Sequence, residues 1–222
     1  MNRRGLLRLG CAHCALLAAR AFGAESSDWV DPPRFTAPDP ASDEGGLWAI
    51  VARAERKLRR GEFVIHDEAM HDYVQSIACS LGGAHCPDVR VYVVRAPWFN
   101  ASMAPNGMLQ VWSGLLLRVE NEAQLAAVLG HEIGHYLRRH GLERLRDAET
   151  RSAWGSLLTP LTGPLGSMAL SLGRFSFSRD QEREADSIGL ALMRRAGYDR
   201  DCVETTAAHA IGRRLLVEDY RR

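Results

Sequence analysis

The pentad HEIGH at positions 131–135 constrains this chain more than any other feature of its sequence. Because a helix advances about 100° per residue, His131 and His135 lie on one face and can offer two imidazole nitrogens to a single metal ion. Glu132 lies one step around the helix, where its carboxylate can reach a water molecule on that ion. The alternative is an exposed amphipathic helix whose histidines bind nothing, and the surrounding sequence decides between the two.

The helix that carries the pentad is predicted to begin after Asn121, a favoured N-cap residue with Gln124 three positions later. An apolar stripe follows at helical spacing: Leu125, Leu129, Ile133 and Tyr136. On a helical wheel this stripe lies roughly 120° or more away from His131 and His135, so the histidines face away from the core beneath. Their neighbours on that side are small or uncharged, which favours a dry metal site over a solvated face.

A catalytic zinc site needs three protein ligands and an open position for water, so a third ligand must come from further along the chain. Ser178 and Gln181 form a capping-box pattern that predicts a helix, and Gly197 is a natural residue just past its end. Glu182 and Asp186 share one face of that helix. We expect Glu182 to be the third ligand and Asp186 to accept the free ring N–H of a metal-bound histidine. An ordinary charged helix is the alternative for this segment taken alone.

The same helix offers two carboxylates, Glu182 and Glu184, and only one of them can face the metal because they are about 200° apart. Gly189 and Met193 continue the side of Glu182, and a glycine there lets a neighbouring helix come close. Glu184 shares its side with Arg195, which indicates solvent. We therefore expect Glu182 to bind the metal and a Glu184→Ala replacement to have almost no effect.

The pentad followed by FSRDQEREAD, with its ExxxD spacing, resembles the zinc metallopeptidases of family M48. The upstream segments NASMAPNG and MLQVW are also similar to the family, and the resemblance covers roughly residues 47–200. It implies a gluzincin-type endopeptidase that holds one Zn²⁺ per chain through His131, His135 and Glu182. Glu132 is then the general base.

The predicted fold is an α+β, zincin-like metallopeptidase domain over residues 47–222, mainly helical with a small sheet beside the HExxH helix. Helical patterns cover Leu47–Arg60 and a segment that begins after Asp67, and Val89–Val94 reads as a strand. In zincins of this kind the strand before the HExxH helix lies at the cleft edge, where an extended substrate can add as a further strand. The residues predicted to form it are Met108, Leu109, Gln110, Val111 and Trp112.

Residues 1–24 are predicted to be a secretory signal peptide, because a basic start with Arg3 and Arg4 precedes a short apolar run. The paired arginines suggest the twin-arginine route, with Sec export and a short membrane anchor as alternatives. The Pro-rich residues 25–46 read as an extended or disordered lead-in. The expected location is therefore periplasmic or otherwise exported, with membrane association left open.

Three cysteines remain after such a cleavage. Cys79 and Cys86 bracket a short loop that can close a small disulfide in an oxidising compartment, and two free thiols are the alternative. Cys202 would be unpaired.

Three further features are assigned around the predicted cleft. The uncharged residues 153–172 contain Pro160 and Pro164, which break a helix, so a mobile loop or pair of short helices over the cleft is expected. Peripheral membrane contact through this segment is the alternative. His140 lies on the apolar side of its helix and is expected in the core or beside the site. His209 is a candidate donor to the oxyanion, or a plug.

A net charge of +1 argues against a dedicated nucleic-acid binder. The resemblance implies an endopeptidase that hydrolyses unfolded or misassembled protein substrates in envelope quality control. The alternatives are a latent protease and a chaperone-like binder of unfolded segments, which needs only the cleft and the edge strand. The sequence leaves the oligomeric state open.

Overall fold

The computed structural model describes residues 29–150 and 177–198. The predicted signal peptide, residues 153–172 and His209 lie outside these ranges. In chain order the elements are α2 (Asp43–Arg59), α3 (Glu68–Gly82), the 3₁₀ helix η1 (Gly83–Asp88), β1 (Arg90–Val94), β2 (Ala101–Met103), β3 (Met108–Trp112), α4 (Ser113–Leu116), α5 (Glu122–Leu137), α6 (His140–Thr150) and α9 (Arg179–Arg195). No helix within the described ranges is both long and apolar enough to cross a membrane.

Side-chain caps set where the helices begin. The Asn121 side chain accepts a hydrogen bond from the Gln124 backbone at the start of α5, as predicted. The capping box predicted for α9 is also present, with reciprocal bonds between Ser178 and Gln181. Helix α2 begins at Asp43, earlier than the predicted Leu47, because the Ser42 side chain caps it. The lead-in predicted for residues 25–46 therefore gives way to helix at its C-terminal end.

The three strands form a mixed sheet in the order β1-β3-β2. Strand β3 pairs in parallel with β1 and antiparallel with β2, and all five of its residues are buried. The prediction that Met108–Trp112 is the substrate-binding edge strand is therefore wrong, since neighbours already occupy both of its backbone edges. The strand that lies beside α5 is β2, joined to β3 by a turn at Gly107, whose φ is 89°.

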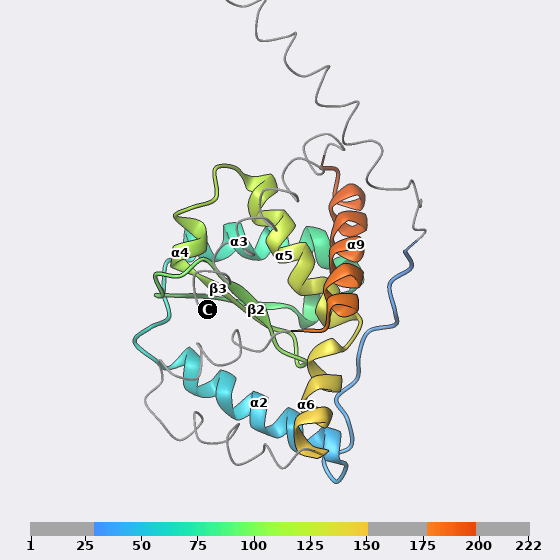
Figure 1. The fold of residues 1–222 in the computed structure, drawn as a ribbon. Helices are drawn as coiled ribbons and strands as arrows, with labels where there is room; N and C mark the ends of the chain where they lie inside the picture. Colours follow the sequence, from blue (N-terminus) through green and yellow to red (C-terminus); the bar gives the residue numbers. More distant parts are fainter. Residues whose placement is uncertain (1–28, 151–176, 199–222) are drawn as a thin grey trace, which may run out of the picture.

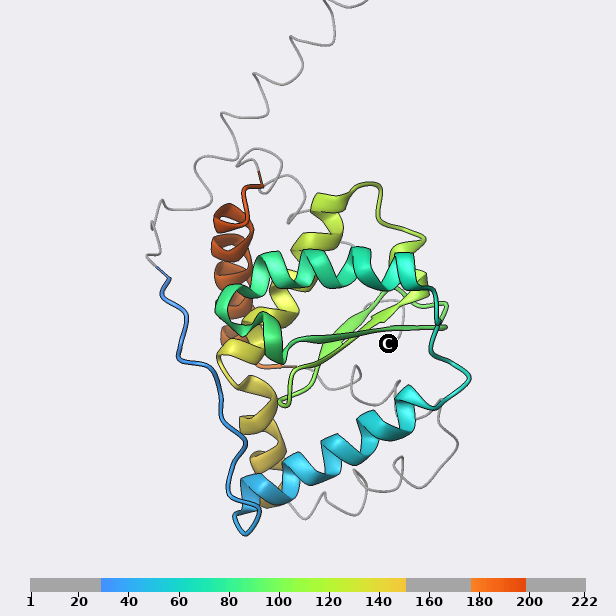
Figure 2. The same cartoon turned by 180° about the vertical axis from the view of Figure 1, so that it is seen from behind.

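The sheet separates two apolar layers. Helices α3 and α5 cover one face and α2 crosses the other, as Figure 1 shows. Helix α9 packs on the side of α5 away from the sheet's centre and shares the larger core. Figure 2 gives the same arrangement from behind, with α3 in front of α5. Helix α5 is thus held by packing on several sides, which fixes the position of the HExxH pentad.

Residues 29–42, here called the N-terminal strap, are extended and fastened to the rest of the structure. The Nε2 atom of His85 lies 2.9 Å from the Pro32 carbonyl oxygen. The Phe35 ring meets the Tyr136 ring edge-on at 5.1 Å. The predicted disulfide between Cys79 and Cys86 is confirmed, and it closes the turn that contains His85. This turn anchors the strap to the surface next to α5.

Candidate metal centre

A close crossing of α5 and α9 brings the two sequence motifs together. A methyl group built on Gly134 would lie 2.8 Å from the backbone oxygen of Ala185, and one on Gly189 would lie 3.0 Å from the carbonyl carbon of Gly130. The backbones can approach this closely only because these positions lack bulky side chains. Gly189 was expected to allow such an approach, whereas its partners on α5, Gly130 and Gly134, were not identified from the sequence.

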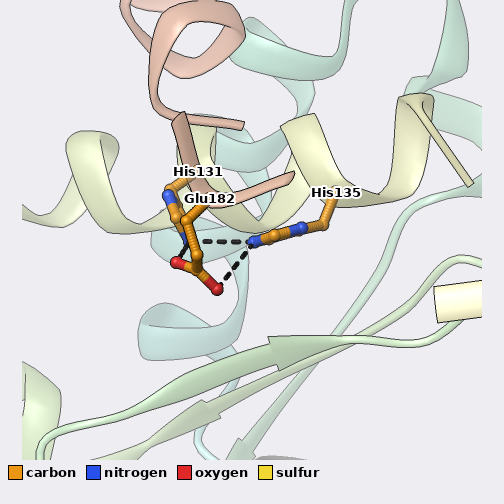
Figure 3. Close-up of side chains that lie close together, drawn as sticks. All are labelled: His131, His135 and Glu182. Atoms are coloured by element: carbon orange, nitrogen blue, oxygen red, sulfur yellow. Dashed lines mark hydrogen bonds and ion pairs between the residues drawn. The ribbon is translucent and has the colours of Figure 1, made fainter. Parts of the chain in front are cut away.

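At this crossing His131, His135 and Glu182 direct their donor atoms to one point (Figure 3). The two Nε2 atoms are 3.1 Å apart, and the Glu182 carboxylate oxygens lie 3.4 Å from His131 Nε2 and 3.7 Å from His135 Nε2. All the donor atoms fall within 4.8 Å of one another. Both histidines are buried and Glu182 is half-buried. Two imidazoles and a carboxylate in this geometry could hold a metal ion.

Asp186 orients one of the two imidazoles. Its Oδ1 atom lies 2.7 Å from His131 Nδ1 and can accept the proton on that nitrogen. With the proton on Nδ1, His131 Nε2 carries a lone pair that faces His135 and Glu182. The structure therefore places Asp186 where the spacing to Glu182 predicted it.

Glu132 lies on α5 next to His131 and is only 4% exposed. Helix α6 brings a cation to the same region, because Arg144 interacts electrostatically with both Glu182 and Glu132. Burial lowers the pKa of the Arg144 guanidinium to about 10, while these two carboxylates oppose the shift, so the group stays charged at neutral pH. The sequence gives no sign of this role for Arg144, because the position of its side chain depends on how α6 packs against α5.

An aromatic ring stacks on one face of the His135 imidazole. The ring of Phe177 lies parallel to the His135 imidazole with the centroids 3.8 Å apart, and the Arg144 guanidinium sits over Phe177 at 4.1 Å. Phe177 immediately precedes the N-cap of α9, so the start of that helix also determines where the ring lies. The stack limits the motion of His135, and no sequence pattern had indicated it.

Glu184 is not one of the three donor residues, as expected, but its partly exposed side chain is held by two partners. Its Oε1 atom binds Arg138 at 2.6 Å and its Oε2 atom lies 3.1 Å from His140 Nε2. Arg195, the residue that had indicated solvent on this side, binds Asp31 of the strap at 2.7 Å. The expectation that Glu184→Ala has almost no effect rested on that reading and is not supported by these contacts.

The profile of Peptidase family M48 matches residues 65–212. The chain is 29% identical over 215 residues to the Beta-barrel assembly-enhancing protease of Escherichia coli K12, covering 86% of this chain and 44% of that protein. It is 31% identical over 202 residues to the protein of the same name from Yersinia pestis, covering 80% of this chain and 41% of the relative. The Mitochondrial metalloendopeptidase OMA1 of Arabidopsis thaliana is 37% identical over 115 residues, 49% of this chain and 23% of that protein.

The chain thus spans less than half the length of the curated relatives named here. The family match includes the HExxH helix, the sheet and α9, which together carry the three donor residues. The chain belongs to peptidase family M48.

Proposed function

We propose that this protein is a zinc-dependent metalloendopeptidase that hydrolyses peptide bonds in protein substrates. The observation that carries the proposal is the convergence of His131, His135 and Glu182 on one point. Donor atoms of a tetrahedral zinc site lie roughly 3.4 Å apart, because each is about 2.0–2.1 Å from the ion. The 3.1 Å between the two Nε2 atoms is close to that requirement. The two Glu182 oxygens also lie near it, with Oε2 3.4 Å from His131 Nε2 and Oε1 3.7 Å from His135 Nε2. Two nitrogens and one carboxylate also leave a fourth position for water.

In this proposal Glu132 moves the proton. When bound, zinc supplies Lewis-acid activation of the attacking water and of the peptide carbonyl. The Glu132 carboxylate takes a proton from that water and passes it to the leaving amine nitrogen. Asp186 holds the proton on His131 Nδ1, which keeps Nε2 available as a ligand. Phe177 shields the face of the His135 ring from solvent.

We assign the substrate-binding edge to β2 in place of β3. Strand β2 lies at the end of the strand order and contacts α5. Met103 at its end and His135 line the same small hollow. An extended, unfolded segment could add to this edge through backbone hydrogen bonds, which requires no particular side-chain sequence. Unfolded or misassembled proteins are therefore the proposed substrate class.

The proposed place of work is the cell envelope. The disulfide between Cys79 and Cys86 is typical of an oxidising compartment. Residues 1–24 carry the composition of an export signal. Relatives named for beta-barrel assembly are consistent with such a location.

The test is the Glu132→Gln variant. We expect it to bind one zinc per chain, because the ligands are unchanged, while cleavage of an unfolded protein such as casein falls roughly 10²- to 10⁴-fold for lack of the base. Glu62→Gln, at an exposed position, is the matched control and should cleave normally. Undiminished cleavage by Glu132→Gln would contradict the mechanism. A zinc-loaded wild type that binds unfolded casein without cutting it would favour the non-hydrolytic alternative.

A further inference from the structure

His135 contacts His140, a histidine that the hydrolytic mechanism does not use. The Nδ1 atoms of His135 and His140 lie 3.0 Å apart, and the two rings meet at a steep angle. His140 is the first residue of α6 and is only 3% exposed. A buried polar ring of this kind is stabilised when each of its nitrogens finds a partner. For His140 the second partner is Glu184, whose Oε2 atom lies 3.1 Å from Nε2.

The carboxylate at one end fixes the protons along this chain of contacts. Glu184 accepts hydrogen bonds only, so His140 carries its proton on Nε2 and has a lone pair on Nδ1. The short contact between the Nδ1 atoms then requires the proton to be on His135 Nδ1, which donates to His140. His135 Nε2 is left with a lone pair directed toward His131 and Glu182.

The opposite arrangement of protons is unfavourable at both ends. A proton on His140 Nδ1 would leave the lone pair of Nε2 facing the Glu184 carboxylate. It would also place the His135 proton on Nε2, where a metal ligand needs a lone pair. Arg138 secures the arrangement, since it binds the second Glu184 oxygen at 2.6 Å.

We propose that His140 and Glu184 are positioning residues that hold His135 in the tautomer that presents Nε2 to the metal. The inference rests on the proposed zinc function and assigns a role to two residues that do not touch the metal. Asp186 acts directly on His131, whereas Glu184 acts on His135 through His140. Both carboxylates lie on α9, which also carries Glu182. One helix therefore supplies a metal ligand and sets the tautomers of the two other ligands.

The experiment measures zinc affinity of the full chain by competition with a chelator. We expect His140→Ala and Glu184→Ala each to weaken zinc binding roughly 10- to 100-fold. The double variant should be no weaker than His140→Ala alone, because the two residues act in series. His71→Ala and Asp180→Ala are the controls, as an exposed histidine and an exposed carboxylate of α9, and should bind zinc as wild type does.

His140→Asn separates positioning from packing, because its side-chain oxygen can accept the proton of His135 Nδ1. We expect this variant to recover part of the affinity lost in His140→Ala, and thermal unfolding of the metal-free proteins checks that both fold. His140→Ala with wild-type affinity, or His140→Asn as weak as His140→Ala although folded, would overturn the proposal. Failure of the proposed function gives a different result, namely a wild type that binds no zinc or a Glu132→Gln variant that still cleaves.

Discussion

Glu55 of α2 shows how a single buried carboxylate joins distant parts of the fold. It is mostly buried and accepts hydrogen bonds from Arg90 and Tyr92 of β1 and from Asn106 in the turn between β2 and β3. Burial by itself raises the pKa of Glu55, but the Arg90 hydrogen bonds and charge and the other two donors outweigh it. The pKa of the carboxyl therefore lies below its usual range.

This depressed pKa predicts acid sensitivity. A group with a lowered folded-state pKa contributes stability that is present above its unfolded pKa, about 4.3, and is lost as the pH falls through the folded value. We expect Glu55→Gln to lower the free energy of unfolding by about 1.5–3 kcal/mol at pH 7. The loss should be smaller near pH 3, which is below the unfolded pKa, because the carboxyl of the unfolded chain takes up a proton there. Urea unfolding at the two pH values measures the difference, with Glu62→Gln as control. An equal loss at both pH values would contradict the prediction.

Residues three or four positions apart on one helix could be predicted to share a face. The structure places His131 and His135 on one face of α5, as their spacing indicated. Glu182 lies on another helix and was expected beside them from the need for a third ligand and from the resemblance to family M48. Contacts that depend on how different helices pack were not predictable in this way. Arg144 and Phe177 are examples, because no periodicity within one helix relates them to His135.

At the scale of elements, the α5–α9 crossing depends on glycine for its close approach. A methyl group on Gly134 would meet the backbone oxygen of Ala185 at 2.8 Å and its Cα at 3.1 Å, so the helices must move apart. Helix propensity alone would favour alanine by about 0.8–1 kcal/mol, and overpacking costs about 1–3 kcal/mol. We expect Gly134→Ala to be destabilising overall and to weaken zinc binding, since Glu182 moves away with α9.

Gly46→Ala is the matched control for that prediction. Gly46 lies in α2, and an added methyl group there would meet no atom within 4 Å. The same substitution should therefore raise stability by up to about 1 kcal/mol and leave zinc affinity unchanged. Thermal unfolding and chelator competition measure both effects. If Gly134→Ala behaved like Gly46→Ala, tight backbone packing would not be what positions Glu182.

The order of the strands in the sheet could not be predicted from each strand's sequence taken separately. The bounds of β3 were predicted correctly, as was most of β1. Their neighbours in the sheet were not, because β2 is only three residues long and carries no strand pattern of its own. Pairing with β3 makes it a strand, and the edge position follows from that pairing.

For the molecule as a whole, the N-terminal strap links segments far apart in the sequence. It lies beside α9 and α6 in Figures 1 and 2 and is bound at several points. Asp31 binds Arg195 of α9, and Arg34 binds Asp88 at the end of η1. A composition rich in proline predicted extended chain here and gave no sign of these attachments, which depend on where α9 and η1 lie in the folded structure.

The disulfide between Cys79 and Cys86 gives a prediction for the stability of the whole molecule. Cys79 and Cys86 are separated by 7 positions, and closing so short a loop restricts the unfolded chain by about 2.5 kcal/mol in the chain-entropy model. His85 lies inside the loop and contacts Pro32 and Phe35 of the strap, so opening the loop also loosens that attachment.

We expect the Cys79→Ser, Cys86→Ser double variant to lose about 2–3 kcal/mol in denaturant unfolding and to be cut more readily within the strap by an added protease. Wild type treated with reductant should lose a similar amount, because the same loop is opened, whereas the double variant should not respond to reductant. Zinc affinity should change little in both cases, since the donor residues are held by the packing of α5 against α9. A double variant as stable as the oxidised wild type, with an equally resistant strap, would show that the His85 turn keeps its structure without the disulfide.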